Sequence, residues 1–434
     1  MRHTQSQFHS FCVGNTNYYV PISNPSAINS EGESVFYKPR HIVEKANSLN
    51  FLVLYVTNSC NLACKYCFAA KSSTMKPLNM PLGTAHRAVD FLFKTPASKV
   101  AIRFFGGEPL LNFELIKEVV HYAENLSVKT NKKISFSIFT NAVLLSQKYA
   151  FFLKEHDFTT YVSIGASERS HNQLRPLKTE GNSFDMTVKN VEKLLKLMPY
   201  KVVVRVILNP NEQEISLHKT LDFLTKKIGF VFVSFEVPWV EASSPFSLNT
   251  SSLEWIKEEF SVLSDLYIKR FLRKDFSWLG FHQFGNKLRL LVDEDKPLDT
   301  HSCGAGNEML AISTDGFIYP CQSFVGMKSF ELGNVEEGLI NKKLYETFYY
   351  YSAETVPICK TCWARFLCET RCPFDSLLFS HNMYIPNHFR CSLERHINER
   401  ALYIYTTIKQ KNPRLLSSVF RWLTERGTKK LGVW

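Results

Sequence analysis

The chain has 434 residues, of which 45% are hydrophobic and 21% charged, and this length and composition are typical of a folded globular protein with two or three domains. No apolar run approaches the roughly 18 residues of a membrane-spanning helix, and no apolar signal segment follows Met1, so we expect a cytoplasmic protein without a membrane span. The net charge of +12 favours an anionic partner, but the basic residues are scattered and no nucleic-acid-binding motif occurs, so we expect no nucleic-acid partner.

Residues 1–50 are polar and rich in turn-forming residues, and we expect an N-terminal extension with one or two strands. From residue 51 to 240, segments rich in β-branched and aromatic residues predict six strands, at 51–57, 100–105, 134–140, 161–165, 202–208 and 230–237. Helical spacing of apolar residues lies between them, at 85–93, 113–126, 146–156, 184–197 and 215–228. This alternation predicts an α/β fold with a parallel sheet, and six units predict an open, partial (β/α)6 TIM-like barrel with its chemistry at the carboxyl ends of the strands.

The rest of the chain divides into three predicted parts. Residues 241–300 are a linking helical region, with helical periodicity at 253–271. Cysteines are concentrated in a domain at 301–395. Residues 396–434 form a helical tail with an apolar face, which we expect to pack against its own domain.

Ten of the eleven cysteines fall into spaced groups, which in a reducing compartment indicates metal binding more often than disulfides. Cys60, Cys64 and Cys67 follow the first predicted strand at C-x3-C-x2-C spacing. Three thiolates can hold three irons of a four-iron, four-sulfur ([4Fe-4S]) cluster and leave the fourth iron open to another ligand. A structural zinc site is the alternative, but it usually takes four protein ligands, and this loop offers no fourth cysteine or histidine.

Polar residues and glycines follow the next strands on the same predicted face. The second strand leads into Gly106, Gly107, Glu108 and Pro109, where two glycines allow a close backbone approach. The other strand ends contribute Thr140 and Asn141, then Ser163 and Arg175, and Glu236. Glu236 is expected at the substrate mouth, where it binds or deprotonates substrate, with a structural role as the alternative.

The cysteine loop, the Gly-Gly-Glu-Pro element and Thr-Asn together resemble the radical S-adenosylmethionine (radical SAM) enzymes. The resemblance implies that the open iron binds the amino and carboxylate groups of SAM, and that one electron from the cluster yields methionine and a 5′-deoxyadenosyl radical, which abstracts a hydrogen atom from an unactivated carbon. It also implies that SAM is bound by Tyr66 near the adenine, by Gly106, Gly107 and Glu108 at the amino end, by Thr140 and Asn141, and by Ser163 and Arg175 at the ribose or carboxylate. The chain departs from the family at Ala142, which is usually glycine, and in Ser163-Ile164-Gly165, where an aspartate is usual.

The later cysteines resemble the SPASM domain, which carries two auxiliary [4Fe-4S] clusters and so brings the total to three. The resemblance implies one cluster on Cys303, Cys321 and Cys372, and another on Cys359, Cys362, Cys368 and Cys391. Some members have one more cysteine where this chain has Met309, so we expect an open iron on the first auxiliary cluster. Cys-x2-Cys pairs also bind structural zinc, which is the alternative.

SPASM proteins mostly modify peptides or proteins, and the resemblance leaves several reactions open. Anaerobic sulfatase maturases, which form formylglycine, have an aspartate base directly after the second SPASM cysteine, and Gln322 cannot take a proton. We therefore favour a maturase that forms an oxidative C–C, ether or thioether cross-link in a ribosomally synthesised precursor peptide, with an external electron donor such as flavodoxin or ferredoxin. The segment before residue 51 is short for a complete leader-peptide-binding module. A non-catalytic electron carrier and a small-molecule dehydrogenase or epimerase are further alternatives.

Overall fold

The computed structural model describes residues 8–13, 16–21, 28–29, 48–72, 75–76, 78–293 and 303–423. Its core is a ten-stranded sheet in the order β13-β12-β11-β10-β4-β5-β6-β7-β8-β9. The six strands predicted for the barrel are present and run parallel: β4 (Phe51–Thr57), β5 (Lys99–Gly106), β6 (Lys133–Thr140), β7 (Thr159–Gly165), β8 (Val202–Ile207) and β9 (Phe232–Glu236). The predicted α/β fold with an open, partial barrel is confirmed.

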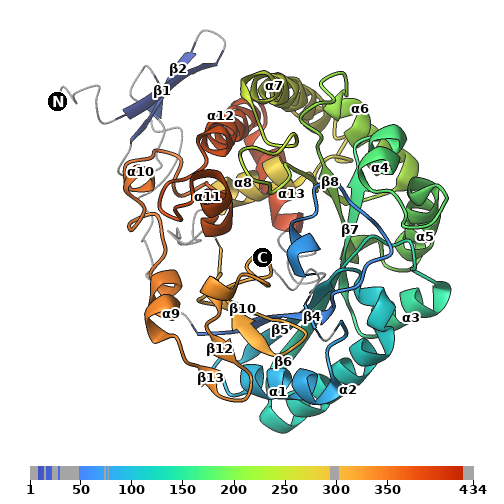
Figure 1. Cartoon of the computed structure of the whole chain (residues 1–434). Helices are drawn as coiled ribbons and strands as arrows, with labels where there is room; N and C mark the ends of the chain where they lie inside the picture. The colour runs from blue at the N-terminus through green and yellow to red at the C-terminus, as the bar shows by residue number, and fades with distance from the viewer. Residues whose placement is uncertain are drawn as a thin grey trace.

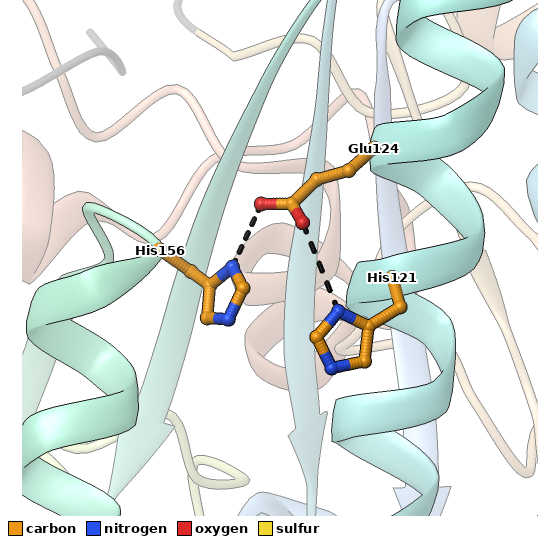
Figure 2. A group of neighbouring side chains, drawn as sticks. All are labelled: His121, Glu124 and His156. Atoms are coloured by element: carbon orange, nitrogen blue, oxygen red, sulfur yellow. Dashed lines mark hydrogen bonds and ion pairs between the residues drawn. The ribbon is translucent and has the colours of Figure 1, made fainter.

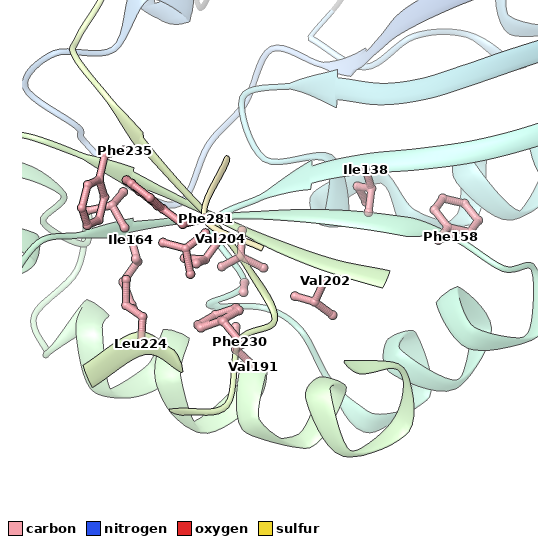
Figure 3. Close-up of a cluster of buried hydrophobic side chains, with 14 of the residues drawn as sticks. Ile138, Phe158, Ile164, Val191, Val202, Val204, Leu224, Phe230, Phe235 and Phe281 are labelled. Atoms are coloured by element: carbon pink, nitrogen blue, oxygen red, sulfur yellow. The ribbon is translucent and has the colours of Figure 1, made fainter. Parts of the chain in front are cut away.

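Helices cover the outer face of these strands (Figure 1): α1 (Leu82–Phe93), α2 (Phe113–Thr130), α3 (Gln147–Glu155), α4 (Glu168–Leu174), α5 (Ser183–Leu197) and α6 (Leu217–Asp222), which continues as the π-helix η5 (Phe223–Ile228). Side chains on this face, such as Ile138, Ile164 and Val204, are at most 1% exposed and pack against the helices (Figure 3). The short α4 was not predicted, because seven residues carry too little helical periodicity.

Four strands from the cysteine-rich part extend the same sheet: β10 (Met309–Ile312), β11 (Phe317–Tyr319), β12 (Gly333–Asn334) and β13 (Gly338–Leu339). β10 runs parallel to β4, with Met309 opposite Phe51. The cysteines that follow lie among β11, α9 (Lys342–Tyr349), α10 (Pro357–Lys360), α11 (Pro373–Ser380) and the start of α12 (His388–Lys411). Because the sheet is continuous, it holds the cysteine-rich part directly beside the strand that precedes Cys60.

The remaining helices are α7 (Thr250–Leu272) and α8 (His282–Val292), both within the region 241–300 that was predicted to be helical, and α13 (Pro413–Leu423). α12 runs without a break through the predicted division between residues 395 and 396. α13 packs back on the protein, with Leu416 and Phe420 buried and the Phe420 ring stacked on Phe271 at 6.2 Å. Within residues 1–50, three strands form a small sheet, at Phe8–Val13, Thr16–Pro21 and Ile28–Asn29. No helix among the described residues is long and apolar enough to span a membrane.

Candidate active site

One cleft at the carboxyl ends of the barrel strands brings the predicted site residues together. Its lining includes the predicted residues Cys60, Cys64, Tyr66, Cys67, Gly106, Gly107, Glu108, Thr140, Asn141, Ser163, Arg175 and Glu236. These residues come from segments far apart in the chain, and the parallel strands bring their carboxyl ends to the same rim. The predicted positions therefore form one site, while the role of each residue stays a prediction.

The cysteine loop is held by backbone contacts with the segment that follows α4. Ala63 N donates to Pro176 O and Lys65 N to Leu174 O, each at 2.9 Å. Burial raises the pKa of the Cys60 thiol to about 12, so a free thiolate is disfavoured there at neutral pH. A cation such as cluster iron offsets this cost, so the loop fits a metal-cluster site better than a reactive free thiol.

The two glycines after β5 permit a close approach between two backbone segments. Gly106 has a φ of 137°, and a Cβ there would lie 2.0 Å from Thr57 O. A Cβ on Gly107 would lie 2.1 Å from Ser59 O. With no side chains in the way, Gly107 N donates to Thr57 O at 2.9 Å and Glu108 N to Ser59 O at 2.8 Å. The glycines therefore position the start of the cysteine loop, in addition to lining the cleft.

Glu108 connects the end of β5 to the end of β6 at the wall of the cleft. The side chain is 1% exposed and accepts hydrogen bonds from Thr140 Oγ1 at 2.7 Å, Asn141 N at 2.8 Å and Leu110 N at 3.1 Å. Burial raises the pKa of Glu108 to about 7, although these donors oppose the shift. Asn141 Nδ2 then donates to Asn61 Oδ1 at 2.8 Å. The network fixes the end of β6 against the cysteine loop.

Ala142 occupies a left-handed backbone conformation, with a φ of 60°. Glycine adopts this conformation without strain, whereas alanine is disfavoured by about 1 kcal/mol. The alanine is fully buried in the core, which offsets part of that cost. The departure from the family pattern therefore leaves the turn after β6 in the conformation that the usual glycine would favour.

The buried Arg175 pairs with the half-buried Tyr66 of the cysteine loop. Arg175 Nη1 donates to Tyr66 OH at 2.8 Å, and Arg175 is only 5% exposed. Burial lowers the pKa of Arg175, but Tyr66 and Cys64 raise it by more than burial lowers it. The net pKa is therefore above its ordinary value, and the guanidinium stays charged. Within the described part of the chain, Arg175 Nε has no hydrogen-bond partner. A buried cation with a free donor fits a carboxylate such as that of SAM.

His171 supports the end of β7 from α4. A Cβ on Gly165 would lie 2.7 Å from His171 Cα, and Gly165 N donates to His171 Nδ1 at 3.2 Å. Burial, with a smaller contribution from Arg175, lowers the pKa of His171 from 6.5 to about 3. The folded protein therefore holds this imidazole neutral.

The neutral imidazole predicts acid sensitivity. Below pH 6.5 the unfolded chain protonates His171 and the folded chain does not, so stability falls with decreasing pH towards about 3. We expect this residue to account for a loss of about 2 kcal/mol between pH 6.5 and pH 5. Urea unfolding at the two pH values measures the loss, which His171→Gln should reduce. An equal loss in the variant would contradict the assignment.

The sequence reading missed the side of the cleft formed by β8 and the loop after β9. Arg205 and Trp239 line the cleft there, and the Arg205 guanidinium lies over the rings of Phe139 at 5.2 Å and Trp239 at 5.9 Å. Arg205 also pairs with Glu236, with Nη2 3.4 Å from Oε2. The signal in the sequence was a single arginine inside a run of valines, which is unusual for a buried strand.

Glu236 is ionised in this setting. Burial would raise its pKa, but Arg205 and a 2.7 Å hydrogen bond from Ser234 Oγ together hold the pKa below its ordinary value. A carboxylate stabilised in this way is a weak base. Of the two predicted roles, the geometry therefore favours binding over deprotonation.

The seven later cysteines separate into two neighbouring groups. Burial is the largest cause that raises the pKa of Cys321, and the charge of Cys303 is the second largest. The pKa of Cys372 is raised by the same two causes in the same order. Likewise, burial and then Cys368, Cys359 and Cys362 raise the pKa of Cys391, to about 12. Each of these neighbours belongs to the same predicted ligand set as the cysteine whose pKa it raises, and the two ligand sets stay a prediction. Met309 lies in β10, paired with Phe51.

A buried ion pair supports the second group of cysteines and was not predicted. Lys287, on α8, donates to Glu394 Oε1 at 2.6 Å and to Leu367 O at 2.9 Å, and its side chain is 2% exposed. Leu367 precedes Cys368, and Glu394 lies one turn after Cys391 on α12. The lysine therefore holds together the two segments that carry these cysteines.

The family comparisons agree with this geometry. The model of the radical SAM superfamily matches residues 54–224, and that of the SPASM iron–sulfur cluster-binding domain matches residues 303–363. A cysteine-type anaerobic sulfatase-maturating enzyme of Clostridium novyi (strain NT) is 26% identical over 344 residues, which cover 75% of this chain and 88% of the relative. The sporulation killing factor maturation protein SkfB of Bacillus subtilis (strain 168) is 23% identical over 313 residues, covering 70% of this chain and 67% of SkfB.

A solved structure has a similar fold. Native anSMEcpe with bound AdoMet superposes with a TM-score of 0.69 at 21% identity, covering 86% of this chain and 100% of that chain. The two family models match the parts of the chain that carry the cysteine loop and most of the later cysteines. Taken together with the cleft, they establish that this chain belongs to the radical SAM superfamily, as a radical SAM enzyme with a SPASM domain.

Proposed function

We propose that this enzyme matures a ribosomally synthesised precursor peptide by forming an oxidative cross-link between two of its residues. The main support is the cleft, which combines the cysteine loop and Arg175 on one side with Arg205, Glu236 and Trp239 on the other. The cleft is open to solvent, so a segment of peptide can reach the residues that line it. The similarity to SkfB, named as a maturation protein, favours a peptide substrate.

The residues of the cleft have separate proposed tasks. Cys60, Cys64 and Cys67 hold the cluster, and the Gly106–Glu108 turn and Arg175 bind the methionine end of SAM. When bound, the cluster and SAM supply the 5′-deoxyadenosyl radical that abstracts hydrogen, and the two auxiliary clusters accept the second electron of the oxidation. The surrounding aromatic side chains limit the access of water to the reacting atoms.

Arg205 and Glu236 are proposed to bind the peptide. Their ion pair leaves part of each side chain exposed, 22% for Arg205 and 27% for Glu236. A guanidinium and a carboxylate side by side can bind the carbonyl and N–H groups of an extended peptide. Trp239 adds an apolar surface for a substrate side chain.

Formylglycine formation in a sulfatase is a second candidate, supported by the relative from Clostridium novyi. Gln322 argues against it, because an amide cannot act as the base expected directly after Cys321. In the structure, Tyr55 OH donates to the Gln322 backbone oxygen at 2.6 Å, which fixes the backbone at this position.

Mass spectrometry of the products separates the candidates. The enzyme with reconstituted clusters is incubated with SAM, dithionite and either the small peptides encoded beside its gene or a sulfatase peptide containing cysteine. A loss of two hydrogens without an aldehyde supports the cross-link, whereas an aldehyde on the sulfatase peptide supports formylglycine formation. Unchanged peptide mass with solvent hydrogen at one carbon indicates an epimerase. If the reduced enzyme forms no 5′-deoxyadenosine, the protein is an electron carrier.

Arg175→Lys is expected to weaken SAM binding by about 10- to 100-fold, because lysine cannot reproduce the bond to Tyr66 while also presenting a second donor. Calorimetric titration with SAM measures the change, and the spectrum of the reduced cluster checks that the loop is intact. Arg169→Lys, at an exposed position on α4, the helix that Arg175 directly follows, is the matched control. Equal SAM affinity in both variants would remove Arg175 from the binding site.

A further inference from the structure

Two histidines and a glutamate form a cluster on the outer helical layer, and none of the three lines the active-site cleft (Figure 2). His121 and Glu124 lie one turn apart on α2, and His156 directly follows α3. Glu124 lies between the two imidazoles, with Oε1 2.7 Å from His156 Nδ1 and Oε2 3.9 Å from His121 Nδ1. We infer that this cluster is a binding site for a divalent transition-metal ion, and zinc is the ion that its ligands fit best.

The spacing is compatible with zinc. One ligand atom from each residue lies within 4.8 Å of the other two. Zinc binds imidazole nitrogen and carboxylate oxygen at about 2.0–2.2 Å, so the ligand atoms of a tetrahedral site lie about 3.3 Å apart. The two nitrogen–oxygen distances fall on either side of that value. Small side-chain rotations therefore suffice to bring all three ligands to one ion.

The chemistry of the ligands also favours zinc over calcium or magnesium. Two imidazoles and one carboxylate suit zinc and its neighbours among the transition metals, whereas calcium and magnesium prefer all-oxygen sites. Both imidazoles face Glu124 with Nδ1, so a bound ion would take up a nitrogen lone pair from each ring at that side. Because the set contains no sulfur, it differs in kind from the cysteine sites.

The surroundings orient the ligands and leave the site accessible. The ring of Phe152 lies 4.3 Å from that of His156 and 6.2 Å from that of His121, which restricts how both imidazoles turn. The side chain of His121 is 57% exposed, that of Glu124 39% and that of His156 10%, so solvent reaches the cluster and can supply a fourth ligand. An ion here would connect α2 to the end of α3, the two helices that flank β6 in the chain.

Zinc binding to the full-length enzyme with all its iron–sulfur clusters reconstituted tests the inference, since occupied cysteines cannot bind the added metal. After dialysis against zinc sulfate, elemental analysis counts zinc and iron, and X-ray absorption at the zinc edge identifies the ligand atoms. We expect one equivalent of zinc with only nitrogen and oxygen neighbours at about 2.0–2.2 Å, and unchanged iron.

Three variants distinguish a metal site from a histidine–glutamate hydrogen bond. His121→Ala and His156→Ala should each lower zinc affinity by at least about tenfold, because each removes one ligand. Glu124→Gln keeps an oxygen acceptor for His156 but removes the charge, so it should weaken zinc binding with little effect on the melting temperature. His86→Ala, on α1 and outside the cluster, should bind zinc like the parent protein.

Several outcomes would overturn the inference. These are no zinc retained by the holoenzyme, sulfur in the shell of the bound zinc, displacement of iron by zinc, and unchanged affinity in His121→Ala and His156→Ala. Because the readouts are metal content and coordination, they do not depend on which peptide the enzyme modifies.

Discussion

Cys64→Ala is expected to reduce the formation of 5′-deoxyadenosine from SAM to background. The substitution leaves two thiolates in the loop, and two cannot hold a cluster that normally takes three. Chromatographic detection of 5′-deoxyadenosine after reduction with dithionite measures the effect. Iron content should fall by the equivalent of one cluster, while the SPASM cysteines, which come from residues 303–391, keep theirs.

Lys65→Ala provides the matched control for that experiment. Lys65 is the exposed neighbour of Cys64, and its contact with the rest of the protein is a backbone hydrogen bond to Leu174 O that the substitution retains. This variant should cleave SAM like the parent enzyme. Cleavage of SAM by Cys64→Ala at the parental rate would refute the assignment of this loop as the radical-generating site.

Gly107→Ala is expected to lower SAM cleavage by at least about 100-fold although it changes no proposed metal ligand. The added Cβ would lie 2.1 Å from Ser59 O and 3.0 Å from Cys60 N, so the backbone at the start of the cysteine loop must move. A displacement of about 1 Å in a catalytic site is enough for a loss of this size. The spectrum and iron content of the purified protein show whether the cluster still assembles, and the rate of 5′-deoxyadenosine formation gives the loss.

Gly83→Ala separates the steric effect from a general effect of alanine. Gly83 lies in the first turn of α1, and the nearest atom to an added Cβ there is the flexible end of Arg87 at 3.4 Å. Alanine has a higher helix propensity than glycine, so this variant should be as stable as the parent or slightly more so. Parental activity in Gly107→Ala would mean that the turn after β5 does not position the loop.

The local pattern of the sequence predicted the barrel well. Each of the six strands was placed within two residues at either end, because β-branched and aromatic runs bounded by turn residues are strong local signals. The helix α5 likewise differs from its predicted range by one residue at its start. By contrast, α4 was missed, and the predicted helical region 241–300 gave no bounds for α8. The joining of β10 to β4 was also missed, because a pairing between strands more than 250 residues apart leaves no local pattern.

In the candidate site, too, some features could be predicted from the sequence and others could not. The spacing of Cys60, Cys64 and Cys67 predicted a cluster, because three thiolates on one loop can hold three of its irons. Together with the Gly-Gly-Glu-Pro element, these cysteines carried the family resemblance that implied the SAM site. The side of the cleft that carries Arg205 and Trp239 could not be predicted, since its position depends on how β8 and β9 curve around the barrel.

By itself, then, the sequence determined the chemistry: which residues are available as cluster ligands, and that Cys60, Cys64 and Cys67 follow a strand of a parallel sheet. The tertiary structure decided the surroundings. It placed Arg205 against Glu236, buried Glu108 between Thr140 and Asn141, and put His156 beside α2. Such contacts join residues from separate elements, and they depend on packing and burial over the whole fold, which no local stretch of sequence encodes.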